Sequence, residues 1–191
     1  MKLDGGQTAI NPLFSRVSQE FNNILRVIRE SKGNNKLKFQ FMEEQMTIRL
    51  MTMEDYERVY ELWMSCVGMG LNNLDDSKDG IEQFLLRNPA TCFVAEEDGG
   101  IVGVILAGND GRRGYIYHTA VNPAFRNQGI GAALVESAME ALQALGINKV
   151  ALVVFSKNKD GNDFWEKRGF TTRGDLVYRD KSITEMIRID T

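Results

Sequence analysis

The segment AVNPAFRNQGIGAALVESAMEALQALG constrains the fold of this chain more than any other part of it. A short apolar end and a turn lead to Gly129 and Gly131, and a long run rich in alanine and leucine follows. Glycine lets a ligand approach the backbone closely, because it has no Cβ. The first amides of a helix lack intrahelical acceptors, and the helix dipole favours anions there. The segment therefore predicts a strand–turn–helix junction suited to a pyrophosphate, with Arg126 as a charged contact, or else an ordinary turn and helix cap.

Two other kinds of phosphate site do not fit this segment. A P-loop needs Lys and Ser or Thr directly after the glycine, but Gly131 is followed by Ala132 and Ala133. A dinucleotide fingerprint needs a third small residue where this chain has Leu134. Both classes are therefore excluded.

Composition narrows the class of protein further. The chain has 191 residues, 43% of them apolar, which is enough for one buried core. A net charge of −3 gives no basic surplus for nucleic acid, and the apolar runs are too short to span a membrane. The start of the chain lacks a secretory signal, and Cys66 and Cys92 have no metal-site spacing. We expect a cytoplasmic protein that binds no metal, nucleic acid or membrane.

The first 45 residues differ from the rest and are predicted to be an N-terminal helical extension. They contain apolar residues at helical spacing, followed by the helix-stopping Gly33, Asn34 and Asn35. A lone amphipathic helix must bury its apolar stripe, so it packs on the main domain or on a second subunit. A regulatory or partner-binding helix is the alternative. The apolar stripe consists of Leu13, Phe14, Val17, Phe21, Ile24, Leu25 and Ile28.

Residues 46–191 are predicted to form one α/β (α+β) domain with a mixed sheet of about six to seven strands flanked by helices. The turn Asp98–Gly99–Gly100 predicts a hairpin. Helices are expected at 56–64, 77–87, 129–145 and 161–168. Strands are expected at 47–51, 91–97, 101–108, 114–121, 149–155, 170–178 and 183–189; the apolar run 149–155 predicts a buried strand.

Two motifs resemble the GNAT superfamily of N-acetyltransferases. The first is Arg126-x-x-Gly129-x-Gly131 ahead of a long helix, and the second is NKDGNDFWEKRGF, from Asn158 to Phe170. The order of elements over residues 47–189 is similar to that of the superfamily, whereas residues 1–45 fall outside it. Among its members, the chain most resembles bacterial relatives of the ribosomal-protein N-terminal acetyltransferases.

The resemblance implies acetyl-CoA as co-substrate and a primary amine, on a small molecule or a peptide, as acceptor. It also implies a sheet splayed between the fourth and fifth strands, where the pantetheine arm pairs with the backbone of Thr119, Ala120 and Val121. The side chain of Asn158 would hydrogen-bond the same arm. Dimers are common in the superfamily, which makes a homodimer through the extra helix a further expectation. The amides expected to hold the pyrophosphate are those of Asn127, Gln128, Gly129, Ile130, Gly131 and Ala132.

The chain departs from the superfamily at one cofactor-binding position. Trp165 stands where many members have a tyrosine that meets the departing thiolate. An indole donates a hydrogen bond but is no practical acid. A thiol pKa of about 8.5 makes thiolate a fair leaving group without full protonation, and Tyr178 or a water is the alternative donor. The neighbouring Phe164 is expected to be a core residue of its helix.

The general base is expected on the strand GYIYHTAV, among Tyr117, Tyr115 and His118. Histidine has an ordinary pKa near 6.5, which suits this role. Strand alternation places the two tyrosines on one face and the histidine on the other, and the resemblance favours the tyrosine face. A β-bulge near this point would change that parity. The histidine is otherwise a packing residue, and the tyrosines line the pocket and relay a proton through water.

Acidic residues offer weaker candidates. Glu96 and Glu97 end a predicted strand and are either a base or a solvated hairpin end. Asp75 and Asp76 end the predicted acceptor wall, where they either attract a cationic amine or cap a helix. Three functions stay open: an N-acetyltransferase, a non-catalytic acyl-CoA-binding or sensing module on the same fold, and an interaction protein that works through its N-terminal helix.

Overall fold

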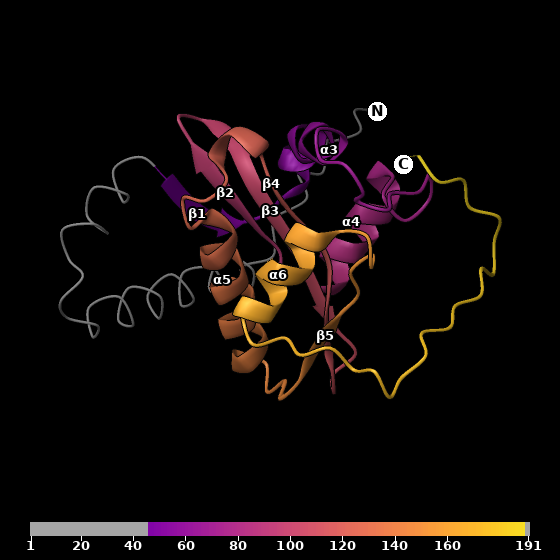
Figure 1. Ribbon diagram of the computed structural model, residues 1–191. Coiled ribbons are helices and arrows are strands. Elements are labelled where there is room, and N and C mark those ends of the chain that lie inside the picture. Colours follow the sequence, from indigo (N-terminus) through magenta and orange to yellow (C-terminus); the bar gives the residue numbers. More distant parts are fainter. Residues whose placement is uncertain (1–45, 190–191) are drawn as a thin grey trace, which may run out of the picture. The chain divides into compact units, whose positions relative to one another are not determined.

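Figure 1 shows a computed structural model of the chain, in which residues 46–189 are described. The predicted N-terminal extension, residues 1–45, lies outside these residues. In the described part, no helix is long and apolar enough to cross a membrane. The strands are β1 (Met46–Leu50), β2 (Phe93–Glu97), β3 (Gly100–Asn109), β4 (Gly114–Val121) and β5 (Val150–Leu152). The helices are α3 (Tyr56–Met64), α4 (Lys78–Arg87), α5 (Ile130–Ala144) and α6 (Lys159–Lys167), with short 3-10 turns at Met53–Asp55 and Pro123–Phe125.

The strands form one mixed sheet in the order β1-β2-β3-β4-β5. The first four strands pair antiparallel, and β5 pairs parallel with β4. The predicted hairpin between β2 and β3 is confirmed: Asp98 and Gly99 have φ of 50° and 76°. Positive φ at two consecutive turn residues gives the twist that joins neighbouring antiparallel strands closely.

Helices cover both faces of the sheet. Trp63 of α3 and Ile81 of α4 share one core with Val104 and Leu106 of β3. On the opposite face, a Cβ at Gly103 would meet Leu134 of α5 at 2.9 Å, so this glycine lets α5 pack closely on β3. Both cores consist of aliphatic and aromatic side chains that are almost fully buried. Each such side chain contributes roughly 1.5–3 kcal/mol to stability when it leaves water.

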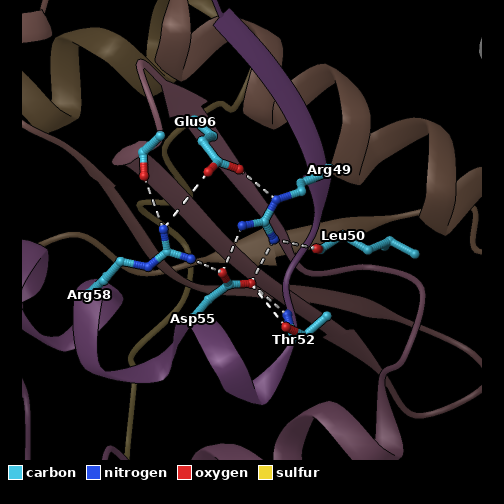
Figure 2. A network of polar contacts seen from close by, with 7 residues as sticks. Arg49, Leu50, Thr52, Asp55, Arg58 and Glu96 are labelled. Atoms are coloured by element: carbon cyan, nitrogen blue, oxygen red, sulfur yellow. Dashed lines mark hydrogen bonds and ion pairs between the residues drawn. The ribbon is translucent and has the colours of Figure 1, made fainter.

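A polar network ties β1 and β2 to the start of α3 (Figure 2). Asp55 is 1% exposed and accepts two hydrogen bonds of 2.7 Å from Arg49 and one of 2.8 Å from Arg58. It also accepts one of 2.9 Å from the backbone N–H of Thr52. Arg49 reaches Glu96 of β2 at 2.8 Å. Glu96, expected as a base or a solvated end, is therefore part of this framework.

The two late strands expected at 170–178 and 183–189 are wrong. Within the described residues the sheet has five strands, and the tail forms only one bridge, between Asn72 and Arg188. Backbone groups of the tail bond to the segment before α4: Asn73 N–H donates to the carbonyl of Ile187 at 3.0 Å, and Ile189 N–H donates to that of Leu71 at 2.9 Å. The backbone groups at the end of the tail thus form hydrogen bonds with the segment before α4 and not with the sheet.

The expected buried strand over 149–155 is also wrong in extent. β5 has three residues, and Val153 and Phe155 just after it are 57% and 41% exposed. Because no later strand pairs with β5 in the described residues, one edge of β5 stays uncovered. A continuous apolar run forms a long buried strand only where neighbours cover it on both sides.

Candidate active site

The glycine turn forms a left-handed entry to α5. Gly129, the N-cap, has φ of 89°, and Asn127 has φ of 63°. The first intrahelical contact at this end is Ala133 N–H to the carbonyl of Gly129 at 3.0 Å. The amides before it have no acceptor within the helix. These amides lie at the positive end of the helix dipole, where an anion would be favoured, so the residues present fit a pyrophosphate.

Gly131 has a packing role as well. A Cβ there would stand 3.2 Å from the ring of Phe164 on α6 and 3.6 Å from the side chain of Val121 on β4. The absence of a side chain therefore lets α6 and the end of β4 lie against the first turn of α5. Phe164, expected to be a core residue of its helix, packs in this contact but is only half-buried.

Arg126 folds back onto β4. Its Nε donates to the carbonyl of Val121 at 3.2 Å, and its Nη2 lies 3.9 Å from Sγ of the buried Cys66. The guanidinium thus bridges the end of β4 and the residues after α3. In this arrangement it is exposed and sits one residue before Asn127, at the edge of the proposed cradle.

The expected gap between the fourth and fifth strands begins at Tyr117. Pairing of β4 with β5 ends at Ile116 and Leu152, and residues 117–121 pair with β3 alone. The N–H of Asn122 donates to the carbonyl of Val102 on β3. Because the backbone groups of successive residues point to alternate sides of a strand, those of Thr119 and Val121 face away from β3, toward the open edge. In the described part of the chain, the buried hydroxyl of Thr119 has no hydrogen-bond partner. An extended ligand arm fits along this edge.

A β-bulge at Tyr117 changes the direction of the side chains. Leu106 faces His118 and Ala107 faces Ile116, so Tyr117 is the extra residue. Plain alternation, which placed Tyr117 and His118 on opposite faces, is therefore wrong, and the alternative of a β-bulge is confirmed, because a bulge points two successive side chains the same way.

Aromatic contacts show where these side chains go. Tyr117 meets Phe84 of α4 edge-on with ring centroids 5.1 Å apart, and Tyr115 lies 4.9 Å from Tyr117. His118 lies 5.2 Å from Trp63 of α3. The three expected base candidates therefore gather on the face that α3 and α4 cover.

His118 is paired with a buried carboxylate that is distant in sequence. Its Nε2 lies 2.6 Å from Oδ1 of Asp76, which is 3% exposed. The other carboxylate oxygen accepts from Asn72 N–H at 2.7 Å, and the Tyr56 hydroxyl donates to the Asp76 carbonyl at 3.0 Å. Asp76 is thus not an open contact for a cationic amine. The sequence singles out Asp76, but nothing local in it indicates this pairing.

The two tyrosines are neutral phenols at neutral pH. Burial raises the pKa of Tyr115, and the neighbouring Tyr178 and Tyr117 add to it. Burial also raises the pKa of Tyr117; the Asp110 carboxylate adds to this effect and Arg87 opposes it. A neutral phenol is a hydrogen-bond donor at this pH.

The second motif forms α6. The Oδ1 of Asn158 accepts from Gly161 N–H at 2.9 Å, which caps the helix and leaves its Nδ2 for other contacts. Trp165 lies edge-on to Phe164 and Phe170, with centroids 5.0 and 5.1 Å apart. The indole is therefore held in an aromatic cluster beside the first turn of α5.

The two thiols differ in position, because Cys66 Sγ lies 3.8 Å from the carbonyl of Val121 at the open strand edge, whereas Cys92 Sγ lies 3.4 Å from the carbonyl of Ala107 on β3. Cys66 and Cys92 are free and buried, and burial raises the pKa of Cys92 to about 12. Among the residues that the structure describes, no group of three potential ligands is placed to hold a metal ion. The arrangement at β4 and α5 thus offers an anion cradle, an open strand edge and a His–Asp pair.

Comparison with known proteins shows the family to which the chain belongs. Residues 56–170 match the model of the acetyltransferase (GNAT) family. The chain belongs to this family. It is 36% identical to an acetyltransferase of Pectobacterium atrosepticum over 127 residues, which are 66% of this chain and 89% of that protein. It is 32% identical to one of Yersinia enterocolitica over 140 residues, or 73% and 98% of the two chains.

Solved structures support the same fold. Ard1 from Thermoplasma volcanium has a TM-score of 0.62 at 24% identity, covering 68% of this chain and 85% of that one. The ribosomal-protein-S18-alanine N-acetyltransferase from Escherichia coli has a TM-score of 0.55 at 19% identity, covering 66% and 77%. The GNAT family implies acyl transfer from acetyl-CoA.

Proposed function

We propose that this GNAT protein transfers the acetyl group of acetyl-CoA to a primary amine by direct attack in a ternary complex. The observation that supports this most is the placement of the α5 N-terminus beside the unpaired end of β4. A pyrophosphate at the α5 N-terminus and a pantetheine arm along the unpaired end of β4 would bring the thioester to the bulge at Tyr117. The bulge also carries His118, so cofactor and proton acceptor meet there.

The cofactor is held mainly by backbone groups in this proposal. The amides of residues 127–132 hold the pyrophosphate, and the open edge from Thr119 through Ala120 to Val121 holds the pantetheine arm. The Nδ2 of Asn158 donates to the same arm, while Trp165 forms part of the wall. When bound, acetyl-CoA would supply an acetyl thioester, from which the CoA thiolate leaves when an amine attacks the acetyl carbon.

His118 is the best base on the strand. An amine is mostly protonated at neutral pH, so it must lose a proton before its nitrogen bonds to the acetyl carbon and the C–S bond breaks. With Nε2–H directed at Asp76, a neutral imidazole carries its lone pair on Nδ1. That atom takes the proton, directly or through a water held by the Tyr117 or Tyr115 hydroxyl. Asp76 acts as a positioning residue, because it fixes the ring.

Two charge substitutions at the ends of α5 test the proposed cofactor site and distinguish a loss of acetyl-CoA binding from a loss of folding. Gln128→Glu places a carboxylate at the exposed mouth of α5, where it favours the helix dipole but repels a pyrophosphate. Gln143→Glu, in the exposed last turn of the same helix, is the matched control. We expect calorimetry to show a roughly tenfold weaker affinity for acetyl-CoA in the first variant only, since like charges near a surface repel by about 1–4 kcal/mol.

Release of CoA in the presence of primary amines then tests the transfer. An unaltered affinity in Gln128→Glu would overturn the cradle. Tight binding of acetyl-CoA without amine-dependent release would instead favour the non-catalytic acyl-CoA-binding module. Trp165, in place of an acidic tyrosine, is the observation that supports this second function.

A further inference from the structure

A hollow of about 500 Å³ opens at the start of β4, at the opposite end of the strand from the glycine turn. Its wall comes from the end of α4, the turn between β3 and β4, and the start of β5. The lining residues that matter here are Arg87, Asp110, Arg113, Tyr115, Tyr117 and Lys149.

The hollow carries an excess of positive charge. Among the described residues, no ion pair engages the side chains of Arg87, Arg113 or Lys149. The single lining carboxylate is Asp110, whose Oδ1 accepts from the backbone amides of Arg112 at 2.8 Å and Arg113 at 2.6 Å, so one of its two oxygens is directed at its own turn.

A second carboxylate, that of Asp175, is close enough to interact with Lys149. The hydrogen bonds from Arg173, at 2.7 and 2.8 Å, lower the pKa of Asp175 most, and the charge of Lys149 lowers it less. Asp175 is therefore already paired. The lining therefore carries three positive charges against the one negative charge of Asp110, an excess that suits binding of a carboxylate or a phosphate.

The hollow adjoins the proposed reaction centre. Tyr117 forms part of its wall, and the next residue along β4 is His118. Tyr115 lines the hollow and lies three residues before His118, so the strand between them spans at most about 10 Å, at about 3.3 Å per residue and less at the bulge. A ligand with its amine at His118 therefore reaches the cations if it also carries an anion about three residues of extended chain away.

We infer that the acceptor is an amine that carries an anionic group, and that Arg87, Arg113 and Lys149 bind this group. The inference rests on the proposed function, because it assigns the amine end to His118. The other source of such an anion is the 3′-phosphate of CoA. The acceptor is favoured, because the cradle at α5 follows the end of β4, whereas the hollow lies at its start.

Triglycine and triglycinamide test this inference on the full chain, because the two tripeptides differ only in the terminal charge. We expect kcat/KM for amine-dependent CoA release to be at least tenfold higher for triglycine. Arg113→Gln and Lys149→Gln should abolish this preference and leave the rate with triglycinamide unchanged. Arg112→Gln, at the neighbouring position outside the hollow, should retain it. Equal rates for both peptides in the unsubstituted protein would overturn the inference while leaving the proposed transfer intact.

A binding measurement decides the matter where neither peptide is a substrate. Glutarate, titrated while backbone NMR shifts are followed, should perturb the amides near Arg113 and Lys149 saturably. This response should be lost in Arg113→Gln and kept in Arg112→Gln; no saturable response would overturn the inference. A weaker affinity of Arg113→Gln for CoA, with unaltered affinity for dephospho-CoA, would assign the hollow to the cofactor's phosphate instead. Failure to bind acetyl-CoA at all would overturn the proposed function, not the anion site.

Discussion

Two buried aspartates of this protein are satisfied by different kinds of partner. Asp55, 1% exposed, receives hydrogen bonds from two guanidinium groups and a backbone amide. Asp76, 3% exposed, faces the imidazole of His118 and the N–H of Asn72. A guanidinium keeps its charge throughout the range in which proteins are folded, whereas an imidazole exchanges its proton near neutrality.

Their places in the fold match this difference. Asp55 joins β1, β2 and α3, at the far side of the sheet from the open strand edge (Figures 1 and 2). Asp76 precedes α4 and reaches β4 one residue beyond the bulge, where the sheet opens. Guanidinium partners with a permanent charge suit a structural contact such as that of Asp55. A titratable imidazole partner, as at Asp76, suits a site at which a proton is transferred. We therefore expect replacements at Asp55 to lower stability and replacements in the proposed Asp76–His118 pair to lower turnover.

Replacement of Asp55 should have the largest effect, and on stability alone. Asp55→Asn leaves Arg49 and Arg58 without their buried counter-charge. Breaking such a pair costs about 3 kcal/mol or more in the free energy of unfolding. Urea unfolding measures this loss, and kcat per folded molecule should be unaltered. A loss below 1 kcal/mol would show that the network contributes little to the framework.

Replacement of His118 should have the next largest effect, and on turnover. His118→Gln should lower kcat roughly a hundredfold, which corresponds to about 2.7 kcal/mol in the barrier. Its affinity for acetyl-CoA should stay within about twofold, because the cradle lies elsewhere. Steady-state kinetics and calorimetry measure the two quantities. A variant that keeps its kcat would remove His118 from the chemistry and leave it a packing residue.

Asp76→Asn tests the positioning role in the same assay. We expect a fall in kcat together with a displaced pH–kcat profile, since the carboxylate no longer fixes the ring, and partial rescue by Asp76→Glu. The free energy of unfolding should fall by only about 1–2 kcal/mol, because one neutral hydrogen bond can be retained. A loss of stability with an unchanged pH–kcat profile would instead show that Asp76 has a purely structural role, like Asp55.

The parts of the fold that depend on local signals could be predicted from the sequence. α3 spans Tyr56–Met64 as expected, and α5 begins after Gly129 as its glycine pattern indicates. The Asp98–Gly99 turn forms the expected hairpin. In each case, residues adjacent in sequence fix the backbone conformation, so tertiary context adds little.

The contacts that decide the site could not be predicted in this way. Asp76 and His118 are 42 residues apart, and Arg49 and Glu96 are 47 apart. A bulge near this point was the alternative to plain alternation, but its position at Tyr117 results from the register between β3 and β4, which the alternation of side chains does not reveal. Periodicity also predicted strands in the tail, whose backbone instead bonds to the segment before α4. Pairing between distant segments decided each of these outcomes.

Acid should weaken the Asp55 network. Burial alone would raise the pKa of Asp55, but the bonds from Arg49 and Thr52 outweigh it and hold this pKa below the usual 3.8. The stabilisation is therefore complete above the unfolded pKa and is lost as pH falls through the folded one. The stability difference between the unsubstituted protein and Asp55→Asn should be constant down to about pH 5 and narrow below about pH 4. Urea unfolding across this range checks it; a difference that widens in acid would contradict the assigned cause.

An exposed carboxylate should show the smallest effect and so define the baseline of the comparison. Glu57 lies two residues after Asp55 and pairs with Lys78 at 3.2 Å, but their side chains are 72% and 61% exposed. Water screens such a pair, and the ordering of two long side chains offsets what attraction remains. Glu57→Gln should therefore change the free energy of unfolding by no more than about 0.5 kcal/mol and leave kcat unaltered. If urea unfolding showed a loss as large as that of Asp55→Asn, burial would not be what distinguishes the two carboxylates. The stabilisation would then come from the charge of the first turn of α3 as a whole.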